Sequence, residues 1–352
     1  APNTGARDLA PAAPNWQTWW ELNKEPFLPR RAHHATATTT GSDDFYLGLR
    51  RRQDAFDRLA PTEADLVHRL VPALARLLEQ ERTRDVQSAC LIALGKLGRD
   101  AVDFELEVQL AERLQRGDQE VRETAALALG IAGRAAGHTR LLALAGDTPE
   151  GRRLLDRSEV DVRTRAFAAY ALGLAARRSG DPALAQRSFE ALVPLLAGGE
   201  RKDRELAAAA ACGLGVLRPD ANRSADKRLA WQAVEPLLDW FRKELGAGDE
   251  LVQAHAPMAV ARLLGRGASD LHQRCKETFR AELVASKRRG PAILQSSAIA
   301  LGALVLPTEQ QPMDAPFVEA LRRAYERGSD QTTRWFAVMA LGRIGGADNR
   351  AW

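Results

Sequence analysis

The side chains able to do chemistry are few and scattered along this chain of 352 residues. The cysteines Cys90, Cys212 and Cys275 lie too far apart for a metal-ligand motif, and their odd number argues against a disulfide framework. His33 and His34 are adjacent, but no third ligand stands at a useful spacing from them. We therefore expect no metal site.

Catalytic motifs are equally absent from the sequence. The other histidines, His68, His138, His255 and His272, are isolated and read as surface or hydrogen-bonded core residues. Gly95-Lys96 lacks the preceding Gly and the following Ser or Thr of a phosphate-binding loop. Neither a Gly-x-Ser-x-Gly elbow nor a Cys/His signature occurs. The sequence predicts a non-enzymatic protein with no catalytic residues and no cofactor.

The composition is that of a folded protein with a balanced surface. The chain has 45% apolar residues, and 50 basic against 46 acidic side chains give a net charge of +4. A nucleic-acid-binding protein concentrates its basic residues on one stripe, so we expect no nucleic-acid partner. The longest apolar run, 206–217, is shorter than the roughly 18 residues that a membrane-spanning helix needs.

A repeated phrase organises most of the chain. It has the form Val-Arg-x-x-Ala-x-x-x-Ala-Leu-Gly, and its copies end at Gly95, Gly130, Gly173, Gly215, a degenerate Gly265, Gly302 and Gly342. The glycines are separated by 35, 43, 42, 50, 37 and 40 residues, a spacing typical of two-helix repeats. Each phrase has its apolar residues at three- and four-residue spacing, which predicts a helix that its glycine ends.

A partner helix is expected before each phrase. The first opens with a cap at Thr62 and has an apolar stripe of Leu66, Leu70, Leu74 and Leu77. Later partners are expected near residues 103–116, 182–197, 227–245, 269–286 and 314–327, with a short partner at 138–145 and a loop insertion at 146–160.

The repeats over residues 62–346 resemble the HEAT family, especially its regular bacterial HEAT-like branch. The resemblance implies an all-α fold, an α-α superhelix (solenoid) of about seven helix pairs with an N-terminal capping segment. The family contains scaffolds and adaptors, chromophore-attaching lyases, an iron hydroxylase and a DNA glycosylase. The hydroxylase would need His-Glu pairs, which this chain lacks. The glycosylase would need a basic concave face with an aromatic cradle, of which Arg334, Trp335, Trp231 and Trp240 supply pieces.

A tryptophan-rich segment precedes the repeats. Trp16, Trp19 and Trp20 share one face of an expected helix that Pro26 stops. The stretch resembles a Trp-Trp-Glu-x-Asn-Lys phrase in exported bacterial HEAT-repeat proteins of unassigned role, which implies a periplasmic or extracellular location. The chain starts at Ala1, so either a signal peptide has been cleaved or the sequence is a fragment.

Two roles are open for these tryptophans. They cap the exposed flank of the first repeat, packing near Leu66, Leu70 and Leu74, or they dock a partner protein. Capping is the favoured role, because terminal repeats of a solenoid need a cover. The predicted domains are residues 1–61, comprising the Trp-rich cap, a linker and a charged helix, and residues 62–352, the solenoid.

The position three residues before each repeat glycine is commonly polar in HEAT-like repeats. Here these positions are mostly apolar, namely Ile92, Leu127, Tyr170, Cys212, Arg262, Ile299 and Met339. They form either an apolar ridge open to a partner or side chains buried by tight superhelical winding, and both alternatives stay open. The C-terminal edge is apolar, which predicts that the solenoid continues beyond residue 352 or that a partner covers it.

The sequence therefore predicts a protein–protein interaction scaffold or adaptor, or a subunit of an exported or envelope assembly. The alternative is a HEAT-scaffold enzyme, either lyase-like or glycosylase-like. The candidate partner-binding residues are Trp16, Trp19, Trp20, Ile92, Leu127, Tyr170, Ile299, Trp335 and Met339.

Overall fold

The computed structural model describes residues 61–197, 203–217, 224–246, 248–285 and 289–352. The chain divides into two compact units, residues 1–66 and 67–352. The first is described only from residue 61, where Thr62 caps α3 (Glu63–Asp65) as predicted: Thr62 Oγ1 accepts from the Asp65 amide at 3.1 Å, and Asp65 Oδ2 accepts from the Thr62 amide at 3.2 Å. The predicted domain boundary at residues 61 and 62 stays a prediction.

The fold is all-α, as predicted, since every regular element in the described part of the chain is a helix; an isolated bridge joins Ala101 to Phe104. The repeated phrases form one set of helices: α5 (Arg84–Leu97), α7 (Gln119–Ala132), α10 (Val162–Ser179), α12 (Arg204–Val216), α15 (His255–Leu264), α17 (Pro291–Leu304) and α19 (Gln331–Ile344). We call these the phrase helices.

The partner helices precede them, close to the predicted ranges: α4 (Val71–Gln80), α6 (Leu106–Arg116), α8 (Ala135–Ala145), α11 (Pro182–Leu195), α13 (Ser224–Arg242), α16 (Asp270–Val284) and α18 (Ala315–Arg327). Shorter elements complete the described chain: a π-helical turn η1 (Leu66–Leu70), α9 (Pro149–Leu155), α14 (Glu250–Gln253), a 3₁₀ turn η2 (Pro312–Asp314) and α20 (Ala347–Ala351).

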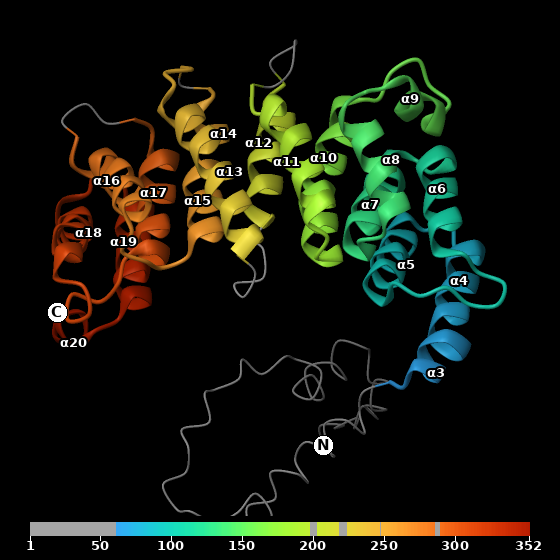
Figure 1. Ribbon diagram of the computed structural model, residues 1–352, viewed down its shortest axis with the longest axis horizontal. Coiled ribbons are helices and arrows are strands. Elements are labelled where there is room, and N and C mark those ends of the chain that lie inside the picture. Colours follow the sequence, from blue (N-terminus) through green and yellow to red (C-terminus); the bar gives the residue numbers. More distant parts are fainter. Residues whose placement is uncertain (1–60, 198–202, 218–223, 247, 286–288) are drawn as a thin grey trace, which may run out of the picture. The chain divides into compact units, whose positions relative to one another are not determined.

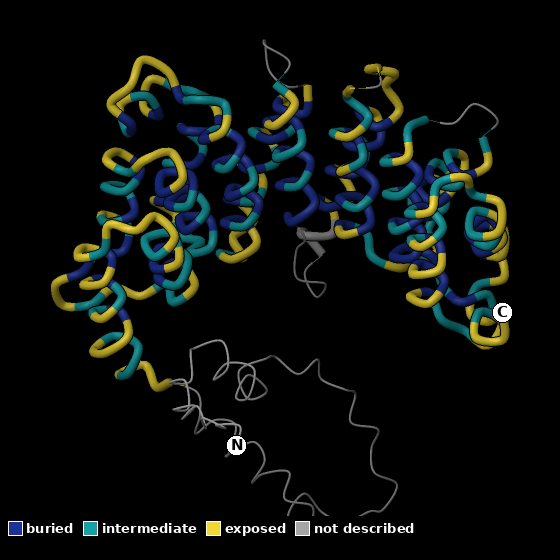
Figure 2. The backbone as a smooth tube through the Cα atoms, turned by 180° about the vertical axis from the view of Figure 1, so that it is seen from behind, coloured by how far each residue is buried: buried dark blue, intermediate teal, exposed yellow. Residues whose placement is uncertain are grey.

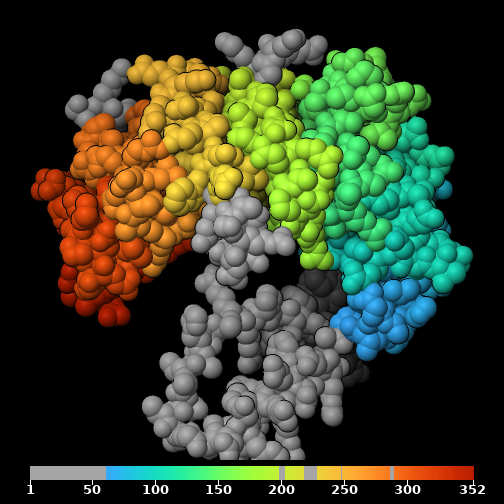
Figure 3. Space-filling model, in the orientation of Figure 1, coloured from blue at the N-terminus to red at the C-terminus, as the bar shows by residue number. Residues whose placement is uncertain are grey.

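Within the second unit the helices pack in chain order (Figures 1 and 3). The phrase helices contact one another in the succession α5, α7, α10, α12, α15, α17 and α19, and each also packs on its own partner helix. Figure 2 shows buried backbone along the sides where helices face each other and exposed backbone at the loops. Small residues such as Ala128, Ala171 and Ala300 are fully buried at these contacts, so the alanine-rich composition sets how closely the helices approach.

Apart from Gly265, the repeated glycines lie inside their helices and do not end them, so that prediction is wrong for the other six. α5 runs past Gly95 to Leu97, and the left-handed cap is Gly98, with φ of 62°. Gly133 plays the same part for α7, with φ of 68°. The repeat glycine lies inside its helix because the next phrase helix approaches it closely: a Cβ on Gly95 would lie 2.8 Å from the Ala128 carbonyl oxygen.

The expected loop at residues 146–160 contains a helix. Thr148 caps α9 by accepting from the Gly151 amide at 3.2 Å, and Pro149 occupies a first-turn position, where its missing N–H costs nothing. The helix ends at Asp156, which takes a left-handed φ of 52°. The Thr-Pro-Glu start is a helix signal, and the prediction missed it because the segment is short.

The predicted stripe on the first partner helix is wrong in part, since Leu74 packs against the core but Leu70 and Leu77 do not. α4 buries Val71, Ala75 and Leu78, while Leu70 remains 40% exposed and Leu77 is exposed as well. The π-helical turn at Leu66–Leu70 shifts the register at this point, so the buried set differs from the one that uniform 3.6-residue spacing predicts.

Toward the C-terminal end, buried polar groups join the helices. The Lys276 ammonium on α16 is 2.6 Å from Asp314 Oδ2 at the start of α18, and both side chains are fully buried. Lys276 Nζ also donates to the Gly267 carbonyl at 2.8 Å, and the Leu306 amide donates to Asp314 Oδ2 at 2.8 Å. The pair thus carries enough hydrogen bonds to be tolerated without water.

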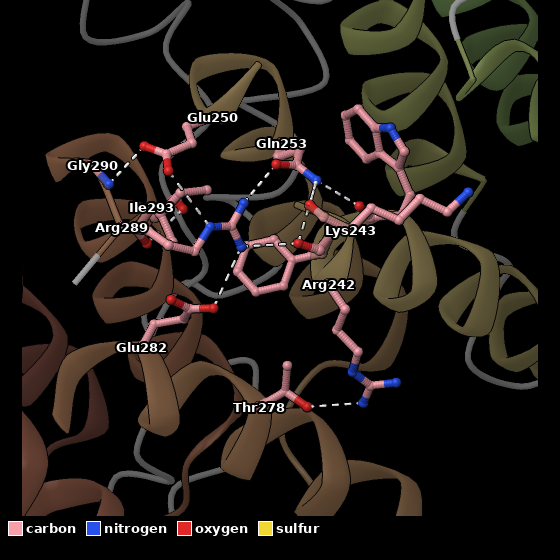
Figure 4. Close-up of polar contacts among 12 residues, drawn as sticks. Arg242, Lys243, Glu250, Gln253, Thr278, Glu282, Arg289, Gly290 and Ile293 are labelled. Carbon is pink, nitrogen blue, oxygen red and sulfur yellow. Dashed lines mark hydrogen bonds and ion pairs between the residues drawn. The ribbon is translucent and has the colours of Figure 1, made fainter. Parts of the chain in front are cut away.

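A second polar cluster closes the end of α13 (Figure 4). The Gln253 amide donates to the carbonyls of Trp240 and Lys243 at 2.6 and 2.8 Å, and Arg289 Nη1 donates to that of Phe241 at 2.9 Å. Arg289 Nη2 also donates to Gln253 Oε1 at 2.6 Å. These bonds satisfy carbonyls that the helix terminus leaves without intrahelical partners.

Candidate functional site

The glycine contacts fix the register between neighbouring phrase helices. Gly95 faces Ala128, and a Cβ on Gly302 would lie 2.6 Å from Ala340 Cα. In both junctions the contacted residue stands two positions before the glycine of its own phrase. Equivalent positions of successive phrases therefore lie side by side.

This register corrects one repeat. A Cβ on Gly215 would lie 2.7 Å from Ala259 Cα, so Ala261, 46 residues after Gly215, takes the place of the repeat glycine in α15. Gly265, with φ of 66°, is instead the C-cap of α15. Met258 then stands at the ridge position, and Arg262 belongs one turn further along the helix. The prediction chose Gly265 because Leu264-Gly265 matches the Leu-Gly end of the repeated phrase.

Four of the predicted ridge residues lie in equivalent places on α5, α7, α10 and α17. Ile92, Leu127, Tyr170 and Ile299 are each half-buried, and so is Met258. They are neither openly exposed nor enclosed, so each presents part of its side chain at the surface beside the next helix. Their role as partner-binding residues stays a prediction.

A pocket opens on this line of residues, between α10 and α12. It has a volume of about 540 Å³. Its lining comes from four equivalent register positions on each helix, with one residue of α15: Arg163, Ala166, Phe167 and Tyr170, then Glu205, Ala208, Ala209 and Cys212, and finally Arg262. Of the candidate partner-binding residues only Tyr170 belongs to it, together with Cys212 and Arg262 from the predicted ridge positions.

The sequence of α12 explains why the hollow lies here. α12 carries Ala208 and Ala209 where α10 carries Ala166 and Phe167, so one wall is lined by methyl groups and the other by aromatic rings. α12 also comes very close to α10, because Gly173 and Gly213 face each other: a Cβ on Gly173 would lie 2.2 Å from the Gly213 carbonyl oxygen. Close backbones and short side chains leave an apolar space bounded by Phe167 and Tyr170.

Charged side chains form the rim of the pocket. Arg163 is paired with Glu123, whose carboxylate is 3.0 Å away. Glu205 lies in the first turn of α12, where its charge suits the positive end of the helix dipole. Arg262 is exposed and has no carboxylate partner among the described residues. Within the described part of the chain, this cation of the rim is therefore not neutralised by a carboxylate.

Cys212 and His255 meet at the edge of the pocket, with Sγ 3.5 Å from Nδ1. Desolvation raises the pKa of the Cys212 thiol, although Arg262 opposes this shift. Desolvation, aided by Arg262, lowers the pKa of His255. Both shifts favour the neutral forms, whereas an activated cysteine nucleophile needs a thiolate beside a cationic partner. The pair therefore lacks the electrostatics of a cysteine–histidine catalytic site.

A second hollow, of about 610 Å³, lies on α13 and α16. Its lining is charged, and each charge has a partner outside the lining. Glu277 pairs with Arg280 at 2.6 Å and Glu282 with Arg289 at 3.4 Å, while Arg242 and Arg274 pair with Asp239 and Glu235. Arg242 at its edge donates to Thr278 Oγ1 at 3.0 Å (Figure 4). Because these charges are already paired, this hollow offers a ligand less than the pocket between α10 and α12.

The remaining predicted residues lie elsewhere. Trp335 and Met339 are on α19 and are 58% and 64% exposed, with Val338 exposed beside them. A Cβ on Gly342, in the same helix, would meet no atom within 4 Å. The expected apolar edge is thus present on α19. Trp16, Trp19 and Trp20 lie outside the described residues.

The pieces suggested for a glycosylase are not assembled into a cradle. Trp240 is buried, at 4% exposure, and so cannot stack on a base. Arg334 donates to the Tyr325 carbonyl at 2.7 Å, a contact within its own helix pair. In the described ranges, no group of three His, Cys, Asp or Glu side chains is arranged to hold a metal ion. None of the helices described here is long and apolar enough to cross a membrane.

Comparisons with known proteins add little to this geometry. No protein-family model and no curated protein matches the chain. Among solved structures, one engineered protein is 21% identical, with a TM-score of 0.40, and the match covers 68% of this chain and 97% of the other. A second engineered protein is 19% identical, with a TM-score of 0.26, over 78% of this chain and 88% of the other. Scores this low carry no argument about fold family or function.

Proposed function

We propose that this chain is a HEAT-like α-solenoid that binds another protein along the ridge positions, with the pocket between α10 and α12 as the principal contact. One observation carries the proposal: a pocket of about 540 Å³ interrupts a line of half-buried apolar side chains on successive helices. Concave apolar sites with a few polar groups at the edge are where proteins bind their ligands.

The shape of the surface favours a protein over a small molecule. Half-buried Leu127 and Met258 stand at the equivalent ridge positions on either side of Tyr170 and Cys212. Neighbouring helices lie about 8–10 Å apart, so this line extends well past the pocket in both directions. A polypeptide segment can contact all of it, whereas a compact ligand would occupy the pocket alone.

A role as an adaptor, or as a subunit of an exported or envelope assembly, is part of the same proposal. It rests on the resemblance of the N-terminal phrase and on the regular repeats. No observation favours the lyase-like or glycosylase-like alternative.

The test is site-specific crosslinking from the rim of the pocket. A photoreactive benzoylphenylalanine replaces Glu205 in the full chain, and a matched control replaces Glu190, which is exposed on α11. The crosslinking is done in the native source, and mass spectrometry identifies the products. We expect a discrete crosslinked protein from position 205 and none from position 190.

Dependence on the pocket is the decisive control. In an Ala209→Trp background, the indole fills the space beside Tyr170, and the crosslink should disappear while the melting temperature is retained. Ala209→Leu serves the same purpose if the larger residue perturbs folding. A crosslink that survives the filled pocket, or equal capture from both positions, would contradict the proposed function.

A further inference from the structure

The chemistry of the pocket restricts what the partner can place in it. This step rests on the proposed function, since it takes the occupant to be a protein segment. The interior is lined by Ala166, Phe167, Ala208 and Ala209, with the Tyr170 ring as one wall. Such a lining gains free energy from an apolar side chain and offers little to a polar one.

The size of the pocket sets the kind of apolar side chain. Aromatic and branched aliphatic groups bury the most area, and aromatic rings also pack favourably edge-to-face with rings such as those of Phe167 and Tyr170. Binding hot spots concentrate where such a side chain enters a pocket and excludes water. We therefore expect one anchoring side chain rather than several small contacts.

The rim sets the charge beside that anchor. Arg163 has its carboxylate partner in Glu123, while Glu205 lies at the other helix's first turn. Arg262 faces the Cys212–His255 contact, where both groups favour their neutral forms, and no described carboxylate pairs with it. A guanidinium that is free in this way can form a bidentate pair with a carboxylate brought by a partner.

We infer that the pocket between α10 and α12 binds a protein segment in which an aromatic or branched apolar residue lies next to a carboxylate, with the apolar side chain between Tyr170 and Ala209 and the carboxylate on Arg262. The carboxylate belongs to Asp, to Glu or to the segment's own C-terminus.

A displayed library of random 12-residue peptides, selected on the immobilised full chain, tests this directly. We expect enriched peptides to carry an aromatic or branched residue within two positions of Asp, Glu or the free C-terminus. Enrichment should vanish on Ala209→Trp. Selection of basic or purely polar peptides, or selection that the filled pocket does not affect, overturns the inference.

A double-mutant cycle then measures the contribution of Arg262 to the binding of the carboxylate. One selected peptide is compared with a counterpart in which the carboxylate is replaced by an amide, through Asp→Asn, Glu→Gln or an amidated C-terminus. Fluorescence anisotropy measures the binding of both peptides to the wild type and to Arg262→Gln. We expect Arg262→Gln to weaken the acidic peptide about tenfold and the amide peptide less than twofold. Arg327→Gln is the matched control, because Arg327 is an exposed arginine on α18, away from the pocket.

The two proposals can fail separately. Equal weakening of both peptides by Arg262→Gln overturns the role of the carboxylate, while a pocket-dependent crosslink from position 205 leaves the proposed function standing. Loss of that pocket-dependent crosslink overturns the proposed function itself.

Discussion

Two junctions between neighbouring helix pairs are built from opposite chemistry, one between phrase helices and one between partner helices. Between α10 and α12, Gly173 and Gly213 bring the backbones together and short alanine side chains leave a pocket at the surface. Between α16 and α18, the buried Lys276–Asp314 pair fills the space with charge and hydrogen bonds. The first junction leaves a hollow to which we assign binding in our proposal, whereas the second fills its space with paired polar groups. A handful of side chains therefore decides whether a junction between neighbouring helix pairs is left hollow or filled by a buried ion pair.

The largest effect is expected at the charged junction. Asp314→Ala leaves the Lys276 ammonium buried without its counter-ion, which should cost about 3–5 kcal/mol in the free energy of unfolding. Urea denaturation followed by circular dichroism measures it. The double variant Lys276→Met with Asp314→Leu removes both charges and should cost less than the single change. If Asp314→Ala lowers the free energy of unfolding by less than about 1 kcal/mol, the buried pair does not stabilise this junction as we describe.

An intermediate effect is expected at the glycine junction. The added Cβ in Gly173→Ala would meet the Gly213 carbonyl oxygen at 2.2 Å, so the helices must separate, at a cost of about 1–3 kcal/mol. Gly342→Ala is the matched control, because its Cβ meets nothing within 4 Å, and helix propensity should then stabilise by up to about 1 kcal/mol. Thermal unfolding of the two variants should shift in opposite directions, and equal shifts would refute the role of close approach.

A smaller effect is expected in the pH dependence of stability, from the contact between the partner helices α8 and α11. His138 Nε2 lies 2.8 Å from Ser188 Oγ, and burial, aided by Arg187, lowers the pKa of His138. The unfolded chain therefore takes up this proton more readily than the folded one, so stability should fall as the pH drops below the ordinary value of 6.5. Urea unfolding at pH 7.5 and 5.5 should show a weaker pH dependence for His138→Gln than for the wild type. An unchanged pH dependence would assign the effect to other groups.

The smallest effect is a difference in reaction rate. Burial raises the pKa of the Cys275 thiol to about 12, and Cys212, half-buried at the pocket, has a raised thiol pKa as well. Iodoacetamide should therefore label Cys212 slowly at pH 8 and faster as the pH rises, with Cys275 unlabelled until unfolding. Mass spectrometry of timed samples reads out the order. A selected peptide should protect Cys212 alone, and labelling of Cys275 at the same rate would contradict this account of burial.

Much of the fold could be predicted from local residue patterns. The Thr62 cap, the seven phrase helices and most of their partners follow from apolar periodicity and capping residues, which act within a few positions of the chain. The role of Gly95 could not be predicted in this way, because a glycine that ends a helix and one that admits a neighbouring helix look the same in sequence. The glycines three or more positions further on, such as Gly98 and Gly133, were the signal that the helices continue.

Less of the candidate site could be predicted, because its residues matter by comparison between repeats. Tyr170 was identified from its own position, but Phe167, Ala208 and Ala209 define the pocket only once α10 and α12 are placed side by side. Arg262 was assigned to the ridge position because the prediction aligned Gly265, instead of Ala261, with the other repeat glycines. This displaced the register of α15 by about one helical turn. The pair Ala208-Ala209, at positions where every other phrase carries at least one larger residue, was the available signal.

The glycine contact has a further consequence for how such a chain can change over evolutionary time. Because Gly95 meets Ala128 much as Gly302 meets Ala340, the surface that one helix pair offers is close to the surface that the next one accepts. Duplicating or deleting one whole pair would rejoin compatible surfaces, so the length of the array can vary without redesigning its contacts. In our proposal, by contrast, binding specificity depends on the few side chains that differ between helix pairs. It can therefore change independently of the length of the array.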